Sequence, residues 1–295
     1  ERRFLSCRVN TRRDNPIRNT LLSFLLASFV VYSATSLIAS DAHDKNLVEK
    51  AKNAVALLYS QDEAGGMRMH CTATSFESFS REEKAETGKM HTVNGYHFVS
   101  AAHCVGSDES TVPGQEKSAK TTNKSFYITF DEVKQTKKFY LARVMWVGYQ
   151  HRGEDFSVFE VVTDDKWPTI PIGDETKESE GASFINVASP LGLGKQVFYG
   201  TISSLYLDRP VVEGDINWKG TLVIQLSGVN GGSSGSALIA DDQQAIVGFL
   251  VGTIGGNIII AIPATRFTAV KKAVEAGKYK WYNPDKQLSP DGTEQ

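Results

Sequence analysis

One glycine-rich segment contains a serine that could act as a nucleophile. Ser234 lies within the run Gly-Gly-Ser-Ser-Gly at 231–235, which is followed by Ser236 and the apolar residues Ala237 and Leu238. Glycines let a loop turn sharply and point its amide groups to one place. A serine there can attack a carbonyl while neighbouring N–H groups stabilise the oxyanion. Because such a run is more often a plain turn, partner residues elsewhere must decide its role.

Two other segments supply suitable partners. His103 ends the apolar run Val-Ser-Ala-Ala-His, and Asp155 opens the alternating run Asp-Phe-Ser-Val-Phe-Glu. A neutral imidazole can accept the serine proton near neutral pH. A buried carboxylate would fix its tautomer and stabilise its charged form. The order His–Asp–Ser is that of chymotrypsin-type enzymes and differs from the order in subtilisins and α/β-hydrolases.

These segments resemble the trypsin-like (chymotrypsin-fold) serine peptidases, and in detail the HtrA-type bacterial branch. The similarity spans roughly residues 52–275. It implies a serine endopeptidase that hydrolyses peptide bonds through an acyl-enzyme, with no cofactor and no metal. The residues that carry it are Ala101–Cys104, Asp155–Val158, Ile224-Gln225, Asn230, Gly232, Ser234-Gly235, Ala237-Leu238, Ser189–Gly194 and Ala261–Pro263.

The resemblance also implies roles for single residues. His103, Asp155 and Ser234 would form the catalytic triad, with the backbone N–H groups of Gly232 and Ser234 as the oxyanion hole. Cysteines at the places of Cys71 and Cys104 form a disulfide in trypsin relatives. The alternative is a pair of free thiols in a reducing compartment.

Substrate preference and activation are inferred from the same resemblance. Gly228 stands where relatives with basic preference carry an aspartate, so small or medium apolar side chains are expected before the scissile bond. The other predicted pocket residues are Phe249, Leu250 and Val251. Ser233 replaces an aspartate that pairs with a new N-terminus in zymogen-activated relatives. We therefore expect activity without such processing.

Short apolar runs that alternate with turn signals predict an all-β fold. The count suits two six-stranded antiparallel barrels, at about 52–165 and 166–263, with the triad in the cleft between them. Helical spacing predicts a closing helix over 265–277, and residues 44–53 are polar with helical spacing. The peptidase domain is thus expected over 44–277, with a charged surface insertion at 77–91. Residues 278–295 form a polar tail, too short for the PDZ domain usual in the HtrA branch.

The N-terminal region predicts export. Residues 1–19 carry six arginines and a net charge of +4, and residues 20–39 contain no charge. As a helix, those 20 residues would cover a hydrocarbon core of about 30 Å. The basic segment would stay cytoplasmic. The hydrophobic segment is either a signal peptide, cut near Ala39 or Ala42, or an uncleaved membrane anchor. A buried core helix is the third alternative.

The net charge and the spacing of the histidines argue against nucleic-acid binding and against a metal site. The chain carries a net charge of −2, and the part after residue 19 carries −6. An acidic surface argues against nucleic acid as a partner. The remaining histidines show no metal-ligand spacing. Polypeptides are therefore the expected partners of an exported or anchored, extracytoplasmic peptidase. Two alternatives are a catalytically silent relative that binds polypeptides as a chaperone or scaffold, and an esterase.

Overall fold

A computed structural model describes residues 44–61, 64–85, 87–105, 125–130, 138–148, 153–207, 212–213, 216–254 and 258–279. The predicted basic segment 1–19, the hydrophobic segment 20–39 and the tail beyond residue 279 lie outside these ranges. No helix within the described ranges is long and apolar enough to cross a membrane.

The first half of the described chain forms a closed antiparallel barrel with strand order β1-β2-β3-β6-β5-β4. Alternating apolar residues in each strand fill its interior, and Phe98, Ile128 and Phe159 are fully buried there. The strands are β1 (Val55–Gln61), β2 (Met67–Lys84), β3 (Met90–Ser100), β4 (Ser125–Thr129), β5 (Tyr140–Val147) and β6 (Ser157–Val162).

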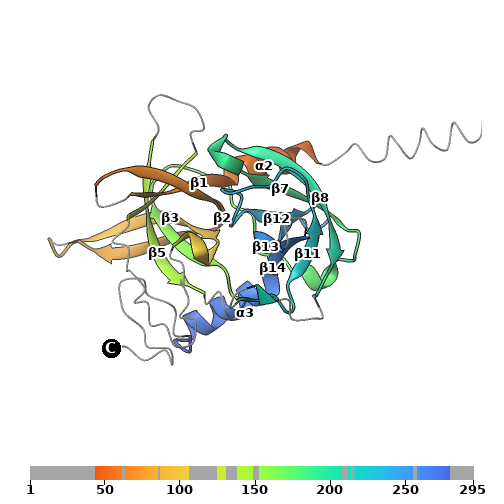
Figure 1. Cartoon of the computed structure of the whole chain (residues 1–295). Helices are drawn as coiled ribbons and strands as arrows, with labels where there is room; N and C mark the ends of the chain where they lie inside the picture. The colour runs from red at the N-terminus through yellow and green to blue at the C-terminus, as the bar shows by residue number, and fades with distance from the viewer. Residues whose placement is uncertain are drawn as a thin grey trace, which may run out of the picture. The chain divides into compact units, whose positions relative to one another are not determined.

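The second half forms another closed barrel with strand order β11-β14-β13-β12-β7-β8, and Figure 1 shows the two barrels side by side. The predicted fold class, two six-stranded barrels with a C-terminal helix, is confirmed. The strands are β7 (Ser183–Ala188), β8 (Gln196–Ser204), β11 (Leu222–Gln225), β12 (Ala237–Ala240), β13 (Ala245–Ile254) and β14 (Ile258–Pro263). The short strands β9 (Val212–Glu213) and β10 (Ile216–Asn217) pair in a separate hairpin.

The charged stretch at 77–91, predicted as a surface insertion, consists largely of paired strand. Its residues extend β2 and β3 as one paired hairpin, in which Phe79 lies opposite Gly95 and Lys84 opposite Met90. Arg81 turns back to the barrel wall, where it and Arg143 form ion pairs with the buried Glu160. Charged side chains therefore cover this ribbon without interrupting its strand pairing.

Two helices flank the barrels. Helix α2 (Lys45–Ala54) begins at Asp44, whose side chain accepts a hydrogen bond from the N–H of Asn46 (2.9 Å). Helix α3 (Ala264–Glu275) follows β14 directly. Because Pro263 at its start has no side-chain acceptor, the buried Glu175 accepts the N–H of Thr265 instead (2.9 Å). A distant carboxylate thus caps α3 and stabilises its positive end.

Candidate functional site

His103 lies on a single 3-10 turn, Ala102–Cys104, directly after β3. A hydrogen bond fixes the start of the turn, where the Ser157 hydroxyl donates to the carbonyl of Ala101 (2.9 Å). A disulfide fixes the end of the turn by joining Cys104 to Cys71 on β2, across a sequence separation of 33. These contacts fix the backbone that carries the imidazole.

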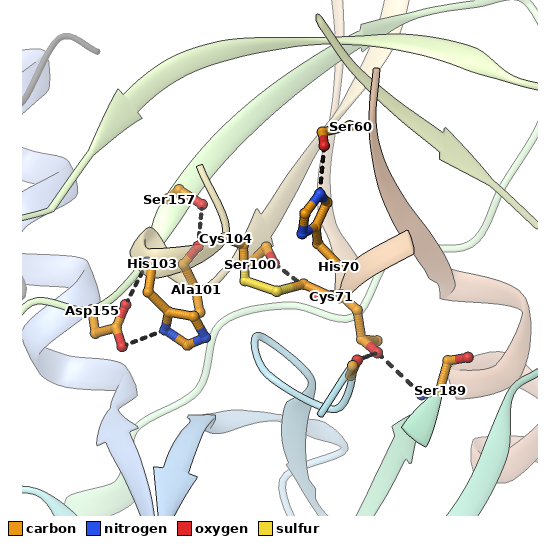
Figure 2. Close-up of a disulfide and its surroundings, with 12 residues drawn as sticks. Ser60, His70, Cys71, Ser100, Ala101, His103, Cys104, Asp155, Ser157 and Ser189 are labelled. Carbon is orange, nitrogen blue, oxygen red and sulfur yellow. Dashed lines mark hydrogen bonds and ion pairs between the residues drawn. A yellow bond between two sulfur atoms is a disulfide. The ribbon is translucent and has the colours of Figure 1, made fainter. Parts of the chain in front are cut away.

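The structure brings His103 and Asp155 together (Figure 2). One carboxylate oxygen of Asp155 lies 2.8 Å from Nδ1 of the imidazole, and the other accepts the backbone N–H of His103 at 2.9 Å. Since a carboxylate can only accept, Nδ1 carries a proton and Nε2 of a neutral ring is left as the base. The Asp155 side chain is 1% exposed, whereas that of His103 keeps 27% exposure.

Opposing effects act on the pKa of His103. Burial lowers it by penalising the charged imidazolium, while the negative charge of Asp155 and its hydrogen bond raise it. The attraction outweighs the burial, so the pKa of His103 lies above its ordinary value. The pair therefore favours the imidazolium that forms when the ring accepts a proton.

Ser234 differs from its neighbouring serines in exposure. Ser233 and Ser236 are fully buried. Their hydroxyls accept hydrogen bonds from the N–H of Asn230 (3.3 Å) and the amide of Asn186 (2.8 Å). Ser234 is only partly buried. Of the three, it is the hydroxyl that a substrate could reach.

The loop that carries Ser234 rests against the His103 segment. A side-chain carbon added at Gly235 would lie 2.3 Å from the Ser100 hydroxyl and 2.6 Å from the N atom of Ala101. Only glycine permits this approach. Within the described residues no hydrogen bond joins the Ser234 hydroxyl to His103.

The carbonyl groups of the loop 231–234 all accept hydrogen bonds, three from other segments and one from within the turn. Those of Gly231 and Gly232 accept from the N–H of Leu191 (2.7 Å) and the Thr72 hydroxyl (2.8 Å). That of Ser233 accepts from the N–H of Ser236 (3.1 Å), and that of Ser234 from the N–H of Thr72 (3.0 Å).

This arrangement leaves two donors available. In a trans peptide the N–H points opposite to the preceding carbonyl, so fixing the carbonyls of Gly231 and Ser233 also fixes the N–H groups of Gly232 and Ser234. Neither N–H donates to any residue in the described part of the chain. Gly232 has φ +97°, and a side chain there would clash with the carbonyl oxygen of Ser189 (2.5 Å). The backbone can therefore offer two N–H groups beside Ser234.

The residues predicted to form a specificity pocket lie mainly in the core. Phe249, Leu250 and Val251 are at most 4% exposed, and the Phe249 ring contacts that of Phe267 (5.3 Å between centroids). These side chains present no surface to a substrate in this structure, so the pocket they were expected to form stays a prediction. At Gly228, an added side-chain carbon would meet the Phe198 ring at 2.8 Å.

One group in the described residues has metal-binding side chains close together. Donor atoms of Cys71, His103 and Cys104 lie within 4.8 Å of one another. The two sulfur atoms are bonded to each other in the structure. In this form the group offers only the imidazole, which already contacts Asp155.

Several contacts of the site were not anticipated from the sequence. Thr72 and Leu191 hold the Ser234 loop, as described above. Arg266 on α3 donates to the carbonyl of Gly153 (2.8 Å), and the Tyr279 hydroxyl donates to Glu154 (2.6 Å). Both contacts reach the segment that carries Asp155. Nothing in the local sequence marks them, except that Thr72 directly follows a cysteine.

Comparisons with known proteins identify the same type of domain. A family profile described as a trypsin-like peptidase domain matches residues 87–249, more than half of the chain. That range contains His103, Asp155 and Ser234. The comparison with curated proteins gave no significant match.

Solved structures of proteases share the fold. The crystal structure of Deg5 aligns with a TM-score of 0.55 at 14% identity, covering 80% of this chain and 95% of Deg5. The HtrA-type protease AlgW with a tripeptide aligns with a TM-score of 0.55 at 15% identity. That alignment covers 80% of this chain and 64% of AlgW, so the chain spans somewhat less than two thirds of that protein. At these identities the similarity is one of fold.

Proposed function

Because the chain belongs to the trypsin-like peptidase domain family, we propose that it is a serine endopeptidase with His103, Asp155 and Ser234 as its catalytic triad. The observation that supports this most directly is the contact of the buried Asp155 with both the ring and the backbone of His103. The partly exposed Ser234, on a loop packed against the His103 segment, supplies the third member.

The proposed reaction proceeds through an acyl-enzyme. Ser234 Oγ attacks the peptide carbonyl and gives its proton to Nε2 of His103. The imidazolium, stabilised by Asp155, then protonates the leaving amine. Water then attacks the carbonyl of the acyl-enzyme ester and gives its proton to Nε2 of His103. The imidazolium returns a proton to Ser234 Oγ as the ester bond breaks, which releases the carboxylic acid product and free Ser234. The carbonyl oxygen becomes negative in each step, and the N–H groups of Gly232 and Ser234 would hold it. One such donor contributes about 3–4 kcal/mol to transition-state stabilisation.

We further propose that the enzyme acts outside the cytoplasm on polypeptides. The disulfide between Cys71 and Cys104 supports an oxidising compartment. The uncharged segment 20–39 after six arginines supports export, as a signal peptide or an anchor. AlgW was solved with peptides bound, in keeping with polypeptide substrates for the fold.

Activation and specificity follow from individual residues. The hydroxyl of Ser233 accepts the N–H of Asn230 within its own turn and carries no charge to pair with a new N-terminus. We therefore propose that no N-terminal processing is needed for activity. The Phe198 ring behind Gly228, where no charge is offered, favours small or medium apolar side chains before the scissile bond.

Hydrolysis of an unfolded protein substrate tests the proposed function. Wild type should cleave it, and Ser234→Ala should lose at least about a thousandfold in rate, because the nucleophile is removed. Ser183→Ala, which alters an exposed serine on β7 outside the site, is the matched control. Binding of the polypeptide without Ser234-dependent cleavage would instead favour the chaperone or scaffold alternative.

A further inference from the structure

Thr72 connects the two barrels at the loop that carries Ser234. It lies on β2 directly after Cys71 and is fully buried. Its hydroxyl donates to the carbonyl of Gly232 (2.8 Å) and accepts the N–H of Ser189 (3.1 Å). The hydroxyl proton is therefore directed at Gly232, because the N–H of Ser189 occupies the acceptor side.

The backbone of Thr72 adds two further contacts. Its N–H donates to the carbonyl of Ser234 (3.0 Å), and its carbonyl accepts from the Ser100 hydroxyl (2.8 Å). One residue thus holds the carbonyls on both sides of the Ser233–Ser234 peptide. The N–H of that peptide is one of the two proposed oxyanion donors.

The Gly232 carbonyl depends on this one side chain. In the described part of the chain, the Thr72 hydroxyl is its only hydrogen-bond donor. Gly231 and Gly232 present no side chain that would hinder rotation of the peptides around them. A partly buried carbonyl that loses its donor is costly, so the turn would rearrange until the carbonyl found another partner.

We propose that the Thr72 hydroxyl is a positioning group for the oxyanion hole, an inference that rests on the proposed peptidase function. It touches neither the substrate nor the triad. By fixing the Gly232 carbonyl it holds the Gly232–Ser233 peptide, which joins the two peptides whose N–H groups, those of Gly232 and Ser234, converge on the place where the oxyanion forms. Its contribution is therefore made in the transition state more than in substrate binding.

Two substitutions at position 72 and one at position 74 test this proposal. Thr72→Val keeps the shape and removes the hydroxyl, whereas Thr72→Ser keeps the hydroxyl and removes the methyl group. Thr74→Val is the matched control. Thr74 lies on the same strand and face and is equally buried, but its hydroxyl has no hydrogen-bond partner among the described residues.

The readouts are kcat and KM for a peptide substrate and the affinity for a peptidyl boronic acid, which mimics the oxyanion. We expect Thr72→Val to lower kcat by about 10- to 100-fold, with KM changed by about twofold or less. Boronate affinity should fall by a similar factor. Thr72→Ser should retain kcat to within about threefold, and Thr74→Val should resemble wild type. Thermal unfolding of each variant separates these effects from loss of the fold.

Wild-type kcat and boronate affinity in Thr72→Val would overturn the proposal. So would a Thr72→Ser variant as impaired as Thr72→Val, since packing of the methyl group would then be the cause. If Thr72→Val does not fold, Thr72→Ala compared with Thr72→Ser carries the same test. A wild-type protein without Ser234-dependent cleavage would overturn the peptidase function and this proposal together, whereas an active wild type with an unaffected Thr72→Val overturns this proposal alone.

Discussion

The substitution Asp155→Asn perturbs the imidazole while it leaves the nucleophile and its loop intact. The Asp155 oxygen that accepts the backbone N–H of His103 at 2.9 Å fixes which way an amide would sit, because only its oxygen can accept there. The amide NH2 then faces Nδ1, where the carboxylate oxygen now lies at 2.8 Å. Two donors cannot share a hydrogen bond, so Nδ1 must give up its proton and Nε2 must carry it.

An imidazole in that tautomer cannot accept the Ser234 proton. The expected loss in kcat is about 10⁴-fold, which corresponds to about 5.4 kcal/mol of transition-state stabilisation. Asp155→Asn also removes the negative charge that raises the pKa of His103, so that pKa should fall. In wild type the acidic limb of kcat/KM should have its midpoint above about 6.5, the ordinary value for histidine. Removing the charge should move the residual activity's midpoint to lower pH.

The assay is hydrolysis of a fluorogenic peptide from pH 5 to 9, for wild type and Asp155→Asn, with histidine NMR titration of both proteins. Glu154→Gln is the matched control, since it neutralises the neighbouring carboxylate without touching His103. A decrease of less than tenfold in kcat, or an unchanged pKa of His103, would mean that Asp155 does not set the tautomer and charge of His103 through these two hydrogen bonds.

Three further predictions follow from other contacts. Replacing Cys71 and Cys104 together by serine should destabilise the fold by about 4 kcal/mol, because the disulfide closes a 33-residue separation; a calorimetric Tm lowered by less than about 5 °C would contradict this. Arg266→Ala should destabilise by about 2 kcal/mol and lower kcat, because Arg266 holds the carbonyls of Gly153 and Gly220. Lys271→Ala on the same helix, which loses only surface ion pairs, should cost about 0.5 kcal/mol, and equal effects of the two variants on unfolding in urea would refute the distinction. Burial raises the pKa of Glu160, but the hydrogen bonds and positive charges of Arg81 and Arg143 lower it by more. The pKa of Glu160 therefore lies below its ordinary value. The stability that Glu160 contributes is therefore present above the pKa of the unfolded chain, about 4.3, and is lost as pH falls through the folded-state pKa. Unfolding measured from pH 7 to 2 should show a shallower acid loss for Glu160→Gln than for wild type and the exposed control Glu180→Gln, and parallel curves would count against this.

Features that depend on local pattern were predictable from the sequence. Alternating apolar residues set the strands of both barrels, and the flanks of His103, Asp155 and Ser234 match the family pattern on which the proposed triad rests. The strand pairing within the stretch at 77–91 was not predicted, because its charges mask an alternation that continues along two long paired strands.

The supporting contacts could not be predicted, because they join residues far apart in the sequence. The Thr72 hydroxyl meets Gly232 across 160 residues, and Arg266 meets Gly153 across 113. The burial of the residues expected to line the pocket could not be predicted for a related reason. The ring of Phe249 contacts Phe267 on α3, a residue 18 positions further along the chain.

The most direct test of the proposed mechanism is covalent labelling with a fluorophosphonate, followed by peptide mapping of the adduct. The probe forms a bond to an activated serine and requires a working base. We predict one adduct per chain, on Ser234, that is lost in His103→Ala and retained in Ser183→Ala. An adduct on Ser233 or Ser236, or labelling of Ser234 that persists without His103, would contradict the account.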